Sequence, residues 1–171
     1  QGQTGMEYPV MAACCAALRQ IGFITLRFNF RGVQGSQGSR SGGLREADDV
    51  HGATGFVLER PDVDRSQVYL IGNSFGAEMV LEAAREAKRV AGMICIVLPL
   101  ALVRAEPEYL RHDHRPKFFV VAERDQFCNL EAFMALYQRW AVPKDLIVLT
   151  GSDHFLGIDP SIAPMDRSTP I

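Results

Sequence analysis

The sequence lacks any apolar run long enough to cross a bilayer. Its longest apolar stretch, from Ala91 to Val103, is too short for a span and contains Pro99, which indicates a buried strand and its exit. Lys and Arg are scattered rather than clustered, and the net charge is only −2. This pattern gives no electrostatic basis for binding nucleic acid or an anionic membrane surface. The expected partners are therefore small molecules or proteins, without nucleic acid or membrane.

Cysteine is also scarce, and no cysteine motif is present. The four cysteines are Cys14, Cys15, Cys95 and Cys128. Two are adjacent in a helical pattern and one lies in an apolar strand pattern, so neither a CxxC metal site nor a disulfide framework is predicted. The first residues, QGQTGMEYP, lack the charged start and apolar run of a secretory signal. A reducing, cytoplasmic setting is the default expectation.

Apolar runs rich in β-branched and aromatic residues alternate with stretches of helical period. This alternation predicts an α/β fold, a three-layer α/β/α sandwich around a mainly parallel sheet. Strands are predicted over residues 23–30, 68–72, 91–98, 117–122 and 146–149, and helices over 9–20, 44–59, 75–87 and 130–140. The length suits one core, so residues 1–158 are expected to form one domain. Residues 159–171 would form a proline-containing tail, loosely attached or disordered.

The segment GNSFG places Ser74 between an apolar strand pattern and a helical pattern. A sharp turn at such a junction strains the serine backbone and presents the hydroxyl above the sheet edge. Gly72 and Gly76 are expected to remove side chains that would collide as strand and helix close up. The N–H of Phe75 would then point to the place where an oxyanion forms. The alternative is a chance match in which the glycines only allow tight packing.

A serine nucleophile needs a histidine to take its proton. His154 follows the last predicted strand, on a loop that a parallel sheet places at the same edge as Ser74. His51 falls within a predicted helix, where a packed or solvated histidine is ordinary. His112 and His114 lie in the charged segment YLRHDHRP, but no further ligand is spaced to complete a metal site. His154 is therefore the predicted base, and no metal site is predicted.

The histidine in turn needs a carboxylate to fix its tautomer and stabilise its charged form. Asp125 follows the strand pattern KFFVVA and lies between Ser74 and His154 in the sequence. Glu123 and Asp153 are alternatives, although Asp153 adjoins His154 and would struggle to reach its ring nitrogen. Asp125 is the favoured acid, and a solvated loop carboxylate is the plain alternative.

The segment RGVQGSQGSRSGG, from Arg31 to Gly43, is too rich in glycine to sustain a helix or strand. Its spacing matches neither a P-loop nor GxGxxG, so a nucleotide site is not predicted. A flexible wall of a catalytic cleft is expected instead. Arg31 is either a structural anchor or a contact to a substrate carboxylate, and the structural role is favoured.

Three parts of the sequence together resemble the α/β-hydrolase superfamily, in particular its compact, lidless bacterial members. They are LRFNFRGVQGSQG, YLIGNSFGA, and the pair VVAERDQF and GSDHFL. The resemblance extends to about Leu156. It implies the α/β-hydrolase fold, with Ser74, Asp125 and His154 as nucleophile, acid and base in the chain order typical of that fold.

The sequence departs from the family at both ends. The first strands are expected to be missing, which would truncate the fold at its N-terminus. One of them belongs between the strands predicted at 23–30 and 68–72, so these would either pair directly or face each other as unpaired edges. Family members usually have a histidine- and glycine-containing turn after the third strand, and the resemblance implies that this turn supplies the second oxyanion donor. The sequence starts inside or just after that turn, so residues 1–3 are the nearest candidates for the donor. The usual final helix is absent or replaced by the tail.

The residues together predict a serine hydrolase that cleaves a small ester or thioester through an acyl-enzyme, with no metal or organic cofactor. Phe127 and Phe155, with Arg31, are candidate pocket residues. Cys128 is expected to be a bystander. The alternative is a binding or assembly module with a vestigial triad. A peptidase is less favoured, because no insertion is large enough to form a cap that selects peptides.

Overall fold

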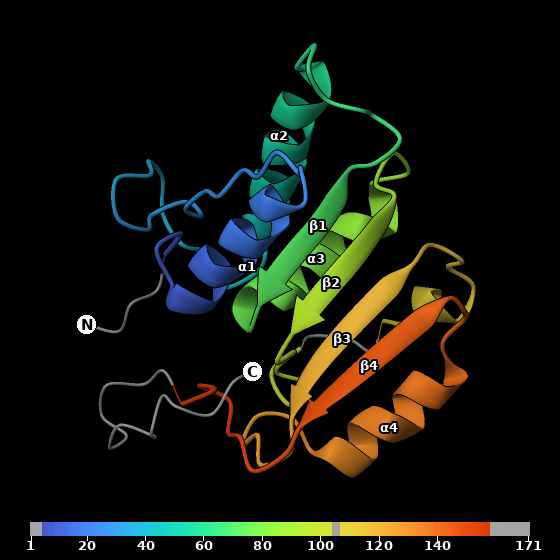
Figure 1. The fold of residues 1–171 in the computed structure, drawn as a ribbon. Helices are drawn as coiled ribbons and strands as arrows, with labels where there is room; N and C mark the ends of the chain where they lie inside the picture. Colours follow the sequence, from blue (N-terminus) through green and yellow to red (C-terminus); the bar gives the residue numbers. More distant parts are fainter. Residues whose placement is uncertain (1–4, 104–106, 158–171) are drawn as a thin grey trace.

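The computed structural model describes residues 5–103 and 107–157, which alternate between helices and strands (Figure 1). The helices are α1 (Pro9–Gln20), α2 (Glu46–Glu59), α3 (Phe75–Glu86) and α4 (Leu130–Arg139), with a short 3₁₀ helix, η1 (Glu108–Arg111). The strands are β1 (Tyr69–Asn73), β2 (Gly92–Ile96), β3 (Lys117–Ala122) and β4 (Lys144–Leu149). All four predicted helices form, and these strands lie within a few residues of their predicted bounds. The predicted tail over 159–171 lies outside the described residues.

The strands form one parallel four-stranded sheet in the order β1-β2-β3-β4. Because all of them run in the same direction, their carboxyl ends share one edge, here called the carboxyl edge. β1 ends just before Ser74, and the loops that follow β3 and β4 carry Asp125 and His154. Three segments that are distant in the sequence therefore meet at this edge.

Helices cover both faces of the sheet, so the predicted three-layer sandwich is confirmed (Figure 1). On one face, α3 packs against β1 and β2, α4 packs against β3, and α2 lies beside α3. The fully buried side chains of this face include Met93, Leu110, Phe119, Val121 and Phe133. On the other face, α1 packs near the carboxyl ends of β2 and β3. No helix within the described ranges is both long and apolar enough to span a membrane.

The prediction of a strand over residues 23–30 is wrong. Among the described residues this segment has no backbone ladder, because the sheet ends at β1, which pairs only with β2. It approaches β1 through side chains instead: the rings of Phe23 and Tyr69 meet edge to face at 6.2 Å. Phe28 and Phe30 pack beside α3. The two segments therefore contact each other through side chains and do not pair directly through their backbones. Side-chain contacts cannot replace the hydrogen bonds that a strand needs.

The outer side of β1 is an unpaired sheet edge in the part of the chain that the structure describes. Ser74 donates its N–H to the carbonyl of Ile96, which shows that this residue faces β2. Since alternate residues of a strand face alternate sides, the backbone groups of Tyr69, Ile71 and Asn73 point away from the sheet. Within residues 5–103 and 107–157, the strand that leads to Ser74 is therefore bonded on one side only.

The glycine-rich loop over residues 31–43 is held on α2 by an ion pair. The guanidinium of Arg31 donates to Asp49, with the closest contact, from Nη2 to Oδ1, at 2.6 Å. The backbone N–H of Arg31 donates to the same carboxylate at 2.9 Å. These hydrogen bonds lower the pKa of Asp49. The charge of Arg31 is thus compensated within the fold.

A second carboxylate closes the other end of this loop. Glu46, at the start of α2, is only 1% exposed. It accepts hydrogen bonds from the backbone N–H and the hydroxyl of Ser41 and from the N–H of Gly43. Burial opposes ionisation of Glu46, but these bonds outweigh it and lower its pKa to about 2. The loop is therefore fixed where it enters the helix.

Replacing Glu46 by Gln is expected to lower the free energy of unfolding by about 1–3 kcal/mol at pH 7, since a neutral amide accepts these bonds less strongly. The folded pKa lies below the ordinary value of 4.5. The contribution of the carboxylate is therefore present above pH 4.5 and is lost as the pH falls toward 2. Urea unfolding of wild type and variant at several pH values measures this, with Glu59→Gln at the exposed end of α2 as control. A difference independent of pH would contradict the assignment.

Candidate active site

Ser74 forms the turn between β1 and α3, with φ of 53° and ψ of −120°. Positive φ is unfavourable for residues other than glycine, so the serine backbone is strained, as the sequence predicted. Backbone hydrogen bonds on both sides of Ser74 hold the turn. Its N–H donates to Ile96 at 2.9 Å, and its carbonyl accepts from the N–H of Ala77 at 2.8 Å. The turn is thus tied to β2 on one side and to α3 on the other.

A second strained residue supports this turn and was not found from the sequence. Val97 follows β2 directly, is fully buried, and has φ of 44°. Its N–H donates to the carbonyl of Val120 in β3 at 2.8 Å. The end of β2 therefore connects the serine turn to β3. A β-branched residue at positive φ is rare, and no sequence signal marks it.

The two glycines around Ser74 differ in what they permit. A Cβ on Gly72 would lie 2.2 Å from the carbonyl oxygen of Gly76 and 2.6 Å from the N of Ala77. Both are backbone atoms that cannot move aside, so Gly72 permits the close approach of β1 and α3. A Cβ on Gly76 would meet nothing within 4 Å. The steric expectation is confirmed for Gly72 and wrong for Gly76.

Ser74 and His154 meet at the carboxyl edge of the sheet. Oγ of Ser74 lies 2.7 Å from Nε2 of His154, within hydrogen-bond distance. When the neutral imidazole carries its proton on Nδ1, Nε2 accepts the hydroxyl proton. His154 is only 6% exposed, so this bond is largely shielded from water.

Asp125 binds the other side of the imidazole. Nδ1 of His154 lies 2.8 Å from Oδ2 and 3.0 Å from Oδ1 of the carboxylate. The Asp125 side chain has no exposed surface, and it also accepts the backbone N–H of Phe127 at 2.8 Å. A buried carboxylate requires such partners, because desolvation of its charge is costly. Its position selects the imidazole tautomer that carries the proton on Nδ1, which leaves Nε2 free of a proton on the side of the serine.

The other candidate acids have different partners. Glu123 accepts the backbone N–H of Gly151 at 2.6 Å. Asp153 accepts the N–H of Phe155 at 3.0 Å and so closes a local turn. The structure thus brings Asp125, rather than these two carboxylates, to the ring of His154.

The remaining histidines lie apart from this arrangement. His51 lies within α2, and His112 follows η1 on the surface. Nδ1 of His114 lies 3.3 Å from the carbonyl of Val142. Across residues 5–103 and 107–157, no group of three or more potential metal ligands comes together.

Phe75 is the first residue of α3, so its N–H lies at the positive end of the helix dipole. None of the hydrogen bonds among the described residues uses this N–H, which can therefore receive an oxyanion beside Ser74. The ring of Phe75 meets that of Phe30 edge to face at 5.5 Å and is partly exposed. The candidates for a second donor, residues 1–3, lie outside the described residues.

Aromatic rings surround the imidazole of His154. The ring of Phe127 meets it edge to face with centroids 4.8 Å apart, and the ring of Phe155 does so at 5.7 Å. Of the three candidate pocket residues, these two lie beside the imidazole. The third, Arg31, directs its guanidinium to Asp49.

Cys128 is close to Asp125 in the sequence but does not form part of the hydrogen-bonded chain. Its thiol is buried, and burial raises its pKa to about 11. The thiol is therefore protonated at neutral pH and is a poor nucleophile.

A family model described as "Alpha/beta hydrolase domain" matches residues 2–161. The chain belongs to the α/β hydrolase family. This confirms the resemblance inferred from the three sequence segments.

Solved α/β hydrolases share the fold of this chain. One is an α/β serine hydrolase homologue from Coxiella burnetii, 29% identical with a TM-score of 0.75, covering 88% of this chain and 70% of that one. Another, XC6422 from Xanthomonas campestris, is described as an α/β serine hydrolase without a lid. It is 27% identical with a TM-score of 0.76, covering 89% of this chain and 67% of that one.

A curated relative is the uncharacterized protein RP471 of Rickettsia prowazekii, 25% identical over 140 residues. The match covers 78% of the present α/β hydrolase chain. It spans 58% of the length of that relative.

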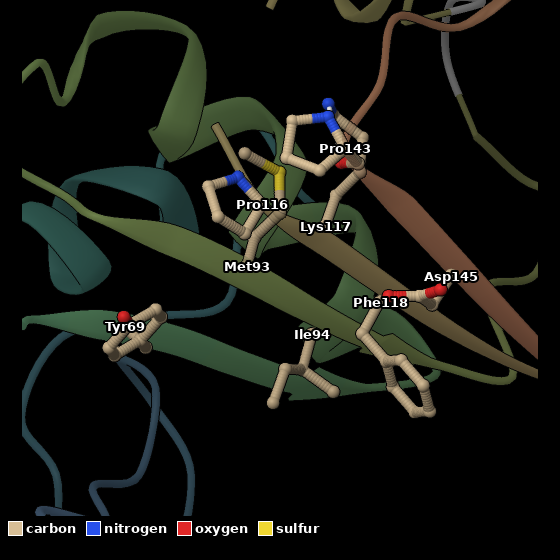
Figure 2. Close-up of a pocket in the computed structure, with 8 residues that line it drawn as sticks. All are labelled: Tyr69, Met93, Ile94, Pro116, Lys117, Phe118, Pro143 and Asp145. Atoms are coloured by element: carbon tan, nitrogen blue, oxygen red, sulfur yellow. Dashed lines mark hydrogen bonds between the residues drawn. The ribbon is translucent and has the colours of Figure 1, made fainter. Parts of the chain in front are cut away.

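This α/β hydrolase chain also has a hollow of about 180 Å³ at the opposite end of the strands (Figure 2). Ile94 and Phe118 project from the same face of the sheet there, and Pro116 and Pro143 lie just before β3 and β4. The full lining is Tyr69, Met93, Ile94, Pro116, Lys117, Phe118, Pro143 and Asp145. Because these residues lie at the amino ends of the strands, the hollow is separate from the carboxyl edge.

Substitution of Gly72 and of Gly76 by alanine should have opposite effects. Gly72→Ala forces backbone atoms apart and is expected to abolish reaction of Ser74 with a fluorophosphonate, with a clear loss of thermal stability. Gly76→Ala meets open space within a helix, so it should raise stability by about 0.5–1 kcal/mol and preserve the reaction. Equal effects of the two substitutions would contradict the steric assignment.

Proposed function

We propose that this chain is a serine hydrolase that cleaves a small ester or thioester through an acyl-enzyme. The observation that carries the proposal is the continuous chain of hydrogen bonds from Ser74 through His154 to Asp125. An imidazole base with a serine hydroxyl at one ring nitrogen and a buried carboxylate at the other is the arrangement that activates a hydroxyl nucleophile.

In the first half of the reaction, Oγ of Ser74 attacks the acyl carbon while Nε2 of His154 takes the hydroxyl proton. The carbonyl electron pair moves onto oxygen, and the N–H of Phe75 donates to that oxyanion. The tetrahedral intermediate then collapses. The bond to the leaving alcohol or thiol breaks, and the imidazolium returns its proton to the leaving group.

In the second half, water attacks the acyl-enzyme. The oxygen of the water bonds to the acyl carbon while His154 takes a proton from the water. His154 then donates this proton to Oγ of Ser74 as the bond between Ser74 and the acyl group breaks and the acid is released. Asp125 remains ionised and stabilises the imidazolium in both halves. The overall reaction consumes one water per ester and needs no metal or organic cofactor.

The surroundings favour an uncharged acyl group. Phe127 and Phe155 present aromatic rings beside His154, and the charge of Arg31 is compensated by Asp49. The similar protein from Xanthomonas campestris is described as a serine hydrolase, and that from Coxiella burnetii as a serine hydrolase homologue. The four cysteines are unpaired, which supports a reducing, cytoplasmic setting.

The nucleophile can be tested with a fluorophosphonate probe and with p-nitrophenyl and thiophenyl esters of acetate and butyrate. Ser74→Ala should abolish labelling. His154→Ala and Asp125→Asn should lower the rate of hydrolysis by about 10²–10⁴-fold, because the first removes the base and the second removes the carboxylate that fixes the tautomer of the base. Ser66→Ala, in a turn before β1, is the control and should react like wild type.

The wild-type result decides between the candidate functions. A folded wild-type protein that neither labels nor hydrolyses these esters would contradict the proposal and favour a binding module that retains the fold. Labelling that persists in Ser74→Ala would contradict the choice of nucleophile.

A further inference from the structure

The loop that carries His154 lies directly on the loop that carries Asp125. Their parent strands, β4 and β3, are neighbours in the sheet. Beyond the strands, the backbone N–H of Glu123 donates to Leu149 at 3.1 Å, and that of Arg124 donates to Ser152 at 2.8 Å. The backbone thus continues the pairing of the two strands into the two loops.

Two side chains then extend this pairing. The carboxylate of Glu123 accepts the N–H of Gly151 at 2.6 Å. The side-chain oxygen of Gln126 accepts the N–H of His154 itself at 3.4 Å. Gly151 has φ of 73°, a conformation in which glycine is favoured. The acid loop therefore holds the base loop through backbone groups on both sides of Ser152.

We infer that Glu123 is a positioning residue for His154, with Gln126 as a second, longer contact. This inference rests on the proposed function. Glu123 does not touch Oγ of Ser74 or the imidazole in this geometry. Its carboxylate holds Gly151, three residues before His154, and so sets where the imidazole stands between Ser74 and Asp125.

The physical reason is that the imidazole can be displaced only slightly without losing one of its two hydrogen bonds. It must keep 2.7 Å to Ser74 and 2.8 Å to Asp125 at the same time. A displacement of about 1 Å at a catalytic group can cost about 100-fold in rate. The base loop has no helix or strand between β4 and Gly157, so its position depends on hydrogen bonds of this kind. A carboxylate suits the task because a charged acceptor bonds an N–H more strongly than a neutral one.

The test compares Glu123→Ala with Glu123→Gln in the full chain. Alanine removes the acceptor and should lower kcat for a p-nitrophenyl ester about tenfold, with KM changed less than about twofold. Glutamine keeps an acceptor and should restore kcat to within about twofold of wild type. Arg124→Ala is the matched control, because only its backbone takes part in the pairing.

Two further measurements do not depend on turnover. Hydrogen exchange at the Gly151 amide should accelerate in Glu123→Ala and not in Arg124→Ala. The low-field proton resonance of Nδ1–H in His154 should weaken or shift in the alanine variant and return in the glutamine variant. Thermal unfolding of each variant shows whether the global fold is intact.

The outcomes separate this inference from the proposed function. An inactive wild type would contradict the hydrolase proposal, and the two spectroscopic readouts would then decide the role of Glu123. If kcat, Gly151 exchange and the low-field resonance are all unchanged in Glu123→Ala, the positioning role is wrong. If the alanine variant does not fold, the glutamine variant decides. Wild-type values of kcat and of Gly151 hydrogen exchange in that variant support the role. A tenfold loss of kcat in a folded glutamine variant with a protected Gly151 amide overturns it.

Discussion

The imidazole of His154 bonds Ser74 through one nitrogen and Asp125 through the other, and this double constraint sets the positions of three loops. No single element of secondary structure can supply all three groups at these distances. The parallel sheet solves the problem because each group follows the carboxyl end of a different strand. The order of the strands makes the acid and base loops direct neighbours, and the end of β2 bridges to the nucleophile. The fold therefore places Ser74 and Asp125 on the two sides of the His154 imidazole.

This arrangement stores strain, which the packing around it must offset. Ser74 and Val97 both have positive φ, each at a cost of about 1–3 kcal/mol. Both are held by backbone hydrogen bonds between strand ends. Beneath them, α3 approaches β1 over Gly72, and its apolar side bears on the buried core. Burial of one large apolar side chain in that core contributes about 1.5–3 kcal/mol, a magnitude comparable with the cost of one strained residue. The carboxyl edge is thus stabilised by the layers below it.

Much of this could be read from the sequence, because the signals were local. The bounds of β3, the helix after Ser74, and the strained serine all follow from patterns of a few residues. The strand predicted over 23–30 failed because a strand is defined by its partner, and composition cannot supply one. The prediction that Gly76 avoids a collision was wrong for a related reason, since only the path of the chain shows which glycine faces a neighbouring backbone. The sequence offers Glu123 only as an alternative acid. Its bond to Gly151 joins two loops, which a linear pattern does not reveal.

The turn that carries the nucleophile is connected to the rest of the sheet through the end of β2. The N–H of Ser74 is bonded to Ile96, and the N–H of the next residue of that segment, Val97, is bonded to Val120 in β3. The imidazole, in contrast, stands on the loops that follow β3 and β4. A shift of β2 along its neighbours would therefore move Oγ of Ser74 relative to Nε2 of His154. The register of β2 between β1 and β3 is thus part of the catalytic geometry, although no side chain of β2 takes part in the hydrogen-bonded chain.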